Sequence, residues 1–273
     1  MRRVILTIIV VVTVFLLVVL IIMGVRKVSA PSGGSKKANP VSVTSLVALA
    51  KDLEAKGSLL EAKAAYQKLI AEIPNAAEVM SWQKKVEEIN VKLLFSPIPT
   101  PKSTTYTIKP GDTLTKIARE FKTTTELLQK SNRLNGDKIV PGQRIKVSTA
   151  AFTILVYKSQ NILILKADDE FVKTYIVATG ANNSTPVGTF KIVNKLTNPT
   201  WFKAGAVVPA ESPENVLGTR WLGFDVSGYG IHGTIEPQTL GKSVTQGCVR
   251  MANPEVEELY AIVPQGTTVT IVD

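Results

Sequence analysis

Two short stretches rich in proline, glycine and serine divide the 273-residue chain and argue against a single continuous fold. They are residues 31–42, PSGGSKKANPVS, and residues 96–105, SPIPTPKSTT. Stretches of this composition behave as flexible or semi-rigid linkers rather than as parts of a packed core. The sequence therefore predicts a multidomain protein, with separate units before, between and after the two linkers.

The first unit is a run of 20 apolar residues, 4–23, interrupted only by two threonines. As a helix this run would be about 30 Å long, which is the thickness of a bilayer core. We expect residues 1–30 to form a transmembrane signal-anchor and residues 31–43 to form a flexible tether. The alternative is a cleaved signal peptide ending at the small residues VSA. The length of the run and the proline that follows VSA favour a retained anchor.

Residues 44–95 are predicted to be helical, since apolar residues recur at spacings of three and four and Gly57 and Pro74 mark helix ends. The stretch GSLLEAKAAYQKLIAEIPN resembles the second half of a tetratricopeptide repeat. Only about one and a half units are present, whereas such repeats are stable in arrays of three or more. We interpret this short all-α hairpin as a helical spacer, with binding of a protein partner as the alternative.

The net charge of +10 is unevenly distributed along the chain. Residues 1–43 carry six basic and no acidic side chains, residues 102–147 carry ten and four, and residues 151–273 carry nine and eleven. A basic surface attracts nucleic acid or other polyanions. Because no nucleic-acid-binding motif accompanies the charge, we expect no nucleic-acid partner.

Residues 106–148 have the pattern strand, helix, helix, strand. Asp112 or Thr113 can cap the first helix, and Thr124 or Thr125 can cap the second. The strings YTIKPGDTLTKIA, SNRLN and IVPGQRIKV resemble a LysM domain from end to end. This resemblance implies a small α+β (βααβ) unit that binds glycans containing N-acetylglucosamine, such as peptidoglycan.

The same resemblance places the glycan groove between two loops of the LysM unit. The implied glycan-binding residues are Gly111, Asp112, Thr113, Leu114, Ile139 and Pro141.

Residues 151–273 are predicted to be mainly β. Residues 152–180 read as three strands broken by turns, residues 254–263 are the one helical pattern, and TTVTIV closes the chain as a strand. A β-sandwich-like domain with one short helix is the expected class.

This domain contains the only histidine and the only cysteine of the chain, His232 and Cys248. A cationic imidazole stabilises a nearby thiolate, so we expect His232 to hold the pKa of Cys248 below that of a free cysteine. In an extended segment Arg250 would emerge on the same face as Cys248 and could bind a carboxylate. Because a structural zinc site needs four ligands, no metal is expected. The alternative is an inert buried cysteine and an unrelated histidine.

The strings STPVGTFKI, NPTWF, NVLGTRWLGF, GYGIHGT and GCVRM resemble the catalytic domain of YkuD-type L,D-transpeptidases. The resemblance implies that Cys248 forms an acyl-enzyme with a peptidoglycan stem peptide and that His232 is the general base. The carbonyl of Gly233 would orient the imidazole, and the amides of Gly247 and Cys248 would form the oxyanion hole. Arg250 would be a structural or carboxylate contact.

Four further residues are implied substrate contacts: Trp201, Tyr229, Thr234 and Thr245. The family usually has serine where this chain has Thr245. No carboxylate is needed for this chemistry, so Asp225 and Glu236 are expected to be ordinary surface residues.

Together these features predict an enzyme without a cofactor whose partners are peptidoglycan glycan strands, stem peptides and the cytoplasmic membrane. It would be a single-pass membrane protein with residues 31–273 on the extracytoplasmic side. Hydrolysis of the stem and exchange of its terminal D-amino acid use the same acyl-enzyme and remain open. An NlpC/P60-type endopeptidase is disfavoured because its cysteine precedes its histidine. A non-catalytic wall-binding anchor is the remaining alternative.

Overall fold

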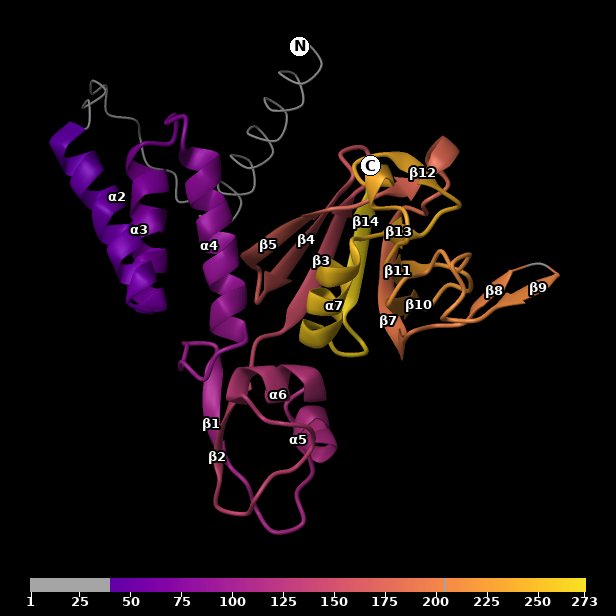
Figure 1. Cartoon of the computed structure of the whole chain (residues 1–273), viewed down its shortest axis with the longest axis horizontal. Helices are drawn as coiled ribbons and strands as arrows, with labels where there is room; N and C mark the ends of the chain where they lie inside the picture. Colours follow the sequence, from indigo (N-terminus) through magenta and orange to yellow (C-terminus); the bar gives the residue numbers. More distant parts are fainter. Residues whose placement is uncertain (1–39, 204) are drawn as a thin grey trace. The chain divides into compact units, whose positions relative to one another are not determined.

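The computed structural model describes residues 40–203 and 205–273 (Figure 1). The predicted anchor and most of the predicted tether lie outside the described residues. Within the described ranges, no helix is both long and apolar enough to cross a membrane.

The first described unit has three helices, with breaks at the Gly57 and Pro74 positions marked in the sequence. Its helices are α2 (Pro40–Ala55), α3 (Leu59–Glu72) and α4 (Val79–Leu94). Helix α2 begins inside the segment predicted as tether, because proline is tolerated in the first turn of a helix. Large side chains spaced three and four apart close the core between the helices, among them Tyr66, Leu69, Trp82 and Ile89.

The second unit has the predicted βααβ order. Its elements are β1 (Ser103–Thr107), α5 (Leu114–Glu120), α6 (Thr125–Asn132) and β2 (Arg144–Ser148), with the two strands antiparallel. Of the alternative caps, the structure selects Thr113, whose Oγ1 accepts from the amide of Lys116, and Thr124, whose Oγ1 accepts from the amide of Leu127. These bonds satisfy amides that a helix leaves unpaired at its start.

The third unit is mainly β, as predicted. Its strands are β3 (Phe152–Tyr157), β4 (Ile162–Ala167), β5 (Glu170–Ile176), β6 (Thr179–Gly180), β7 (Gly188–Thr197), β8 (Trp201–Lys203), β9 (Ala206–Val208), β10 (Arg220–Phe224), β11 (Gly230–His232), β12 (Ser243–Thr245), β13 (Val249–Arg250) and β14 (Thr268–Val272). Its helices are α7 (Asn253–Ile262) and the 3-10 turns η1 (Ala181–Asn183) and η2 (Pro237–Thr239).

Eight of these strands form one sheet in the order β13-β11-β10-β7-β14-β3-β4-β5. The long strand β7 joins its two halves, since residues 188–191 pair with β14 and residues 192–197 pair with β10. The halves therefore share a strand instead of forming the two separate sheets of a sandwich. Helix α7 packs against the sheet through Val256, Leu259 and Ile262, which belong to its hydrophobic core (Figure 1).

The linker at residues 96–105 is held by the neighbouring units, which differs from the extended spacer expected. Lys146 on β2 holds the start of the linker, because its Nζ donates to the carbonyls of Leu93 (2.7 Å) and Ser96 (3.0 Å). Burial at this contact lowers the pKa of Lys146 to about 8. Those carbonyls lie at the end of α4, where a helix leaves acceptors unpaired. Lys102 in the linker donates to the carbonyl of Ala167 at 2.7 Å.

Helix α4 also covers the edge of the catalytic sheet. The Nδ2 of Asn90 donates to the carbonyl of Val172 on β5 at 2.9 Å, where an edge strand would otherwise leave a backbone group unpaired. Burial at this contact raises the pKa of Glu87 to about 7. The helical unit thus protects the free edge of the β domain.

Candidate active site

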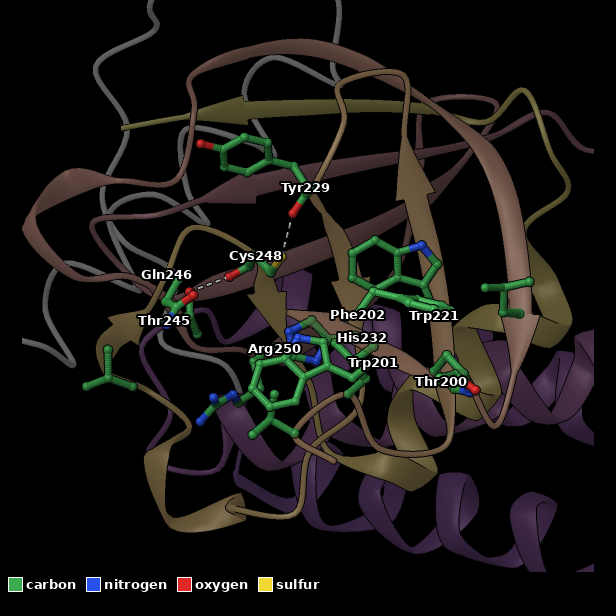
Figure 2. A pocket seen from close by; sticks show the side chains of 16 residues that line it. Thr200, Trp201, Phe202, Trp221, Tyr229, His232, Thr245, Gln246, Cys248 and Arg250 are labelled. Atoms are coloured by element: carbon green, nitrogen blue, oxygen red, sulfur yellow. Dashed lines mark hydrogen bonds between the residues drawn. The ribbon is translucent and has the colours of Figure 1, made fainter. Parts of the chain in front are cut away.

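Strands β11 and β13, which are neighbours in one half of the sheet, position His232 and Cys248. His232 ends β11, and Cys248 immediately precedes β13, which pairs with β11 in parallel so that His232 is opposite Arg250. All three side chains line one cavity of about 750 Å³ (Figure 2). Alternation along β13 explains why Cys248 and Arg250 face the same cavity.

Most of the predicted substrate contacts are in the cavity wall. Trp201, Tyr229 and Thr245 line it, whereas Thr234, Gly233 and Gly247 do not. The complete lining is Leu196, Pro199, Thr200, Trp201, Phe202, Val216, Leu217, Trp221, Gly228, Tyr229, His232, Val244, Thr245, Gln246, Cys248 and Arg250. Trp221 and Phe202 were not singled out from the sequence, although both stand in strings that carry the family resemblance.

His232 is held as a neutral imidazole. Its Nδ1 lies 2.7 Å from the carbonyl oxygen of Gly233, so the ring proton is on Nδ1 and Nε2 is free to accept one. Its ring stacks on Trp221, with centroids 6.0 Å apart. Burial lowers the pKa of His232 to about 4; the bond to Gly233 opposes this shift and the charge of Arg250 adds to it. The imidazole is therefore uncharged at neutral pH.

Cys248 is half-buried, and its environment contradicts the expected thiolate. Burial raises the pKa of the Cys248 thiol, while the backbone amide of Gly230 and the charge of Arg250 only partly offset that rise. The Sγ donates to the carbonyl of Gly228 at 3.4 Å. A neutral imidazole cannot stabilise a thiolate by its charge, so the resting site is a thiol beside a base rather than an ion pair.

The loop before Cys248 is fixed by Thr245. Its Oγ1 donates to the carbonyl of Cys248 at 2.6 Å and accepts from the amide of Gly247 at 3.2 Å (Figure 2). Gly247 has φ +132°, and a Cβ there would lie 2.7 Å from the ring of Tyr229, so only glycine fits. Both contacts use the hydroxyl, which serine and threonine share.

Replacing Thr245 with serine is expected to leave turnover within about threefold of the parent, whereas Thr245→Val is expected to lower it roughly 10- to 100-fold, because loss of both hydrogen bonds frees the loop. Valine keeps the shape of threonine without its hydroxyl, whereas serine keeps the hydroxyl and loses only the methyl group. The measurement is the rate of turnover of the stem peptide that the sequence resemblance implies as substrate, with thermal unfolding as the control for folding. Equal rates for the two variants would contradict this role of the hydroxyl.

Arg250 has an acidic partner that the sequence reasoning missed. Its Nη1 donates to the Oε2 of Glu236 at 2.8 Å and to the Oγ1 of Thr239 at 3.0 Å. The Nε of Arg250 is buried without a hydrogen-bond partner. Glu236 is thus a positioning residue rather than an ordinary surface residue. Asp225 instead accepts from the amide of Lys191 at 3.0 Å.

Asn253 fixes the turn that carries Gly233 and Thr234. Its Oδ1 accepts from the amides of Thr219 (3.2 Å) and Thr234 (3.0 Å), and its Nδ2 donates to the carbonyl of Thr234 at 2.9 Å. A Cβ on Gly233 would collide with Asn253. The hydroxyl of Thr234 accepts from the amide of Glu236, so Thr234 acts within the protein rather than toward the cavity.

The predicted glycan-binding loops lie side by side in the second unit. The amide of Ile108 donates to the carbonyl of Gln143, and the amide of Gly142 donates to the carbonyl of Ile108. Gly111 and Pro141 are exposed and Ile139 is half-buried, so all three are accessible.

The other three predicted glycan contacts have structural roles. Asp112 accepts from the hydroxyl of Tyr106 and the amide of Lys109, Thr113 caps α5, and Leu114 is buried in the core.

A basic imidazole and a single thiol face one cavity next to a fixed arginine, and the part of the chain described holds no cluster of side chains suited to a metal ion. A thiol beside a base can attack a carbonyl carbon and carry an acyl group. These features define a cysteine-dependent acyltransferase.

Comparison with known proteins gives the family. The L,D-transpeptidase catalytic domain (YkuD) matches residues 151–271, and the LysM domain matches residues 106–148. The YkuD protein of Bacillus licheniformis is 40% identical over 174 residues, which span 61% of this chain and 97% of that protein. The YkuD protein of Bacillus subtilis is 36% identical over 174 residues, covering 61% and 98%.

An L,D-transpeptidase structure from Mycobacterium tuberculosis H37Rv shares 14% identity with a TM-score of 0.40, over 50% of this chain and 75% of that chain. The two Bacillus relatives are matched over nearly their whole lengths. The chain therefore belongs to the YkuD family of L,D-transpeptidases and carries a LysM domain.

Proposed function

We propose that this L,D-transpeptidase cuts a peptidoglycan stem tetrapeptide before its terminal D-alanine and transfers the acyl group to an amine of a neighbouring stem. The observation that carries the proposal is the placement of the only histidine and the only cysteine of the chain in one cavity beside Arg250. Hydrolysis and exchange of the terminal residue would use the same intermediate, with water or a free D-amino acid as the acceptor.

In the first half-reaction, the Sγ of Cys248 attacks the carbonyl carbon of the third stem residue while the Nε2 of His232 takes the thiol proton. The resulting oxyanion accepts from the amide of Cys248. The amide of Gly247 already donates to the Oγ1 of Thr245. Because that hydrogen bond is long, at 3.2 Å, the same amide can also donate to the oxyanion. The C–N bond then breaks, and the imidazolium returns its proton to the departing amine of D-alanine.

In the second half-reaction, an acceptor amine attacks the thioester and His232 takes its proton. The C–S bond breaks, and the proton returns to the sulfur as the new amide leaves. His232 is unprotonated at neutral pH, so it can accept a proton at the start of each half-reaction.

Arg250 is proposed to bind the terminal carboxylate of the donor stem. Its Nη1 is occupied by Glu236 and Thr239, so its other donors are the ones available to a ligand. Trp221 and Phe202 provide the apolar wall against which the stem would pack.

The LysM domain is proposed to hold the glycan strand through the loops that contain Gly111 and residues 139–141. Between Ile139 and Pro141, the side chain of Val140 is 56% exposed and therefore accessible to a glycan bound at this loop.

The substitution Val140→Asp is expected to weaken binding to purified peptidoglycan about tenfold, because a carboxylate would lose its hydration under a glycan. The measurement is co-sedimentation of the full chain bearing Cys248→Ala, which prevents turnover. Val187→Asp, at an exposed apolar position on the catalytic domain, is the matched control. Equal sedimentation of the two variants would exclude this loop as the glycan contact.

Residues 1–30 are proposed to be a membrane anchor, with the rest of the chain on the side where peptidoglycan lies. The support is the apolar run at residues 4–23 and the substrate class of the family. Protease added to intact spheroplasts is expected to digest residues 31–273 and leave a small membrane fragment. Complete protection, with an external control protein digested in the same sample, would contradict this topology.

A further inference from the structure

A second cavity, of about 690 Å³, lies where the LysM unit meets the catalytic domain. Helix α5 and the start of α6 form one wall, and the end of α7 with the following turn forms the other. Its lining residues are Thr115, Ala118, Arg119, Lys122, Thr123, Thr124, Thr125, Glu126, Ala151, Phe152, Lys195, Tyr260, Pro264, Gln265, Gly266 and Thr267. It shares no residue with the catalytic cavity or with the predicted glycan loops.

The two units are joined firmly beside this cavity. The hydroxyl of Thr124, which caps α6, donates to the carbonyl of Ala261 in α7. Leu127, from α6, is buried within the core of the catalytic domain. The cavity therefore has walls that belong to one packed unit.

The lining is basic, with Arg119, Lys122 and Lys195 against the single acid Glu126. Lys195 is used by the protein, since its Nζ donates to the carbonyls of Tyr260 (2.6 Å) and Val263 (2.9 Å). Arg119 and Lys122 are exposed, and no acidic side chain in the described ranges forms an ion pair with either. Two cations are thus available at the rim.

We propose that this cavity is an accessory binding site for an anionic wall polysaccharide. A phosphate or carboxylate of the polymer is bound by Arg119 and Lys122, the two exposed cations of the cavity. The site gives the enzyme a contact with the wall separate from the LysM groove, at the junction that fixes the LysM unit on the catalytic domain.

The test is calorimetric titration of the full chain bearing Cys248→Ala with two probes, a glycerol-phosphate oligomer and a glucuronic-acid oligomer. The double variant Arg119→Gln/Lys122→Gln is expected to bind at least one probe about tenfold more weakly, through loss of two charge-assisted hydrogen bonds. A loss confined to the first probe assigns phosphate as the group bound, and a loss confined to the second assigns carboxylate. The control Lys51→Gln/Lys191→Gln removes the same charge at exposed positions outside both cavities and is expected to change affinity less than about twofold.

In the background with Cys248 intact, Arg119→Gln/Lys122→Gln is expected to release D-alanine from a soluble muropeptide at the parent rate. The proposal is overturned if neither probe binds the reference chain, if the double variant binds both as tightly as the control, or if the control loses as much affinity as the double variant.

Discussion

Replacing Cys248 with alanine is expected to reduce release of D-alanine from a stem tetrapeptide to the uncatalysed background, a loss of about 10⁴-fold or more. The physical reason is that Cys248 is the only thiol of the chain, so the variant has no thiol with which to form the acyl-enzyme. Cys248→Ser is the matched control, because it keeps the shape of the site but replaces the thiol by a far weaker nucleophile at neutral pH.

Folding of both variants is checked by their Tm, since a half-buried cysteine contributes some packing. Binding of peptidoglycan by the full chain should be unchanged, because the LysM loops are untouched. If Cys248→Ala turns over within tenfold of the parent rate, the cysteine is not the nucleophile, and another group of the protein carries the reaction.

Replacing His232 with glutamine is expected to lower the acylation rate at pH 7 by about 10²- to 10⁴-fold, the usual contribution of a positioned base. Because burial lowers the pKa of His232 to about 4, the imidazole is already unprotonated at neutral pH and loses its function only as the pH falls toward 4. The parent rate should therefore be nearly level between about pH 5.5 and 7.5 and fall below that range.

The variant should have a different pH profile. Without a base, only the small thiolate fraction of Cys248 can react, so its rate should rise about tenfold per pH unit until the pH reaches the raised pKa of the thiol. Alkylation of the only thiol by iodoacetamide measures that pKa directly, and it should lie above the value for a free cysteine in both proteins. The thiol of the parent protein could instead have a pKa well below that of a free cysteine, and His232→Gln could abolish this shift. That result would show that the resting site is the thiolate–imidazolium ion pair expected from the sequence.

Local sequence patterns predicted much of the architecture. Spacing of apolar residues and the threonine caps located the two LysM helices, and only the choice between adjacent residues, Asp112 or Thr113 and Thr124 or Thr125, required the structure. These features depend on neighbours within one or two turns. The same holds for the catalytic strands, whose alternation predicted that Cys248 and Arg250 share a face.

Features that depend on distant parts of the chain could not be predicted in this way. Glu236 is an unremarkable acid in sequence, and it becomes the partner of Arg250 only because η2 lies against β13. The direction of the pKa shift of Cys248 was predicted wrongly for the same reason, since the burial of both Cys248 and His232 arises from the surrounding loops. The linker at 96–105 is fixed by Lys146, which lies some 50 residues later.

The central claim is that Cys248 carries the acyl group between donor and acceptor, and the mass of the intact protein tests it most directly. After brief mixing with a disaccharide tetrapeptide and acid quenching, one adduct is expected, equal to the donor minus its terminal D-alanine. It should map to Cys248, form with one equivalent of D-alanine, and disappear when an acceptor amine is added. Release of D-alanine with no adduct on Cys248 under conditions that preserve thioesters, or the same adduct on the Cys248→Ala chain, would contradict the account.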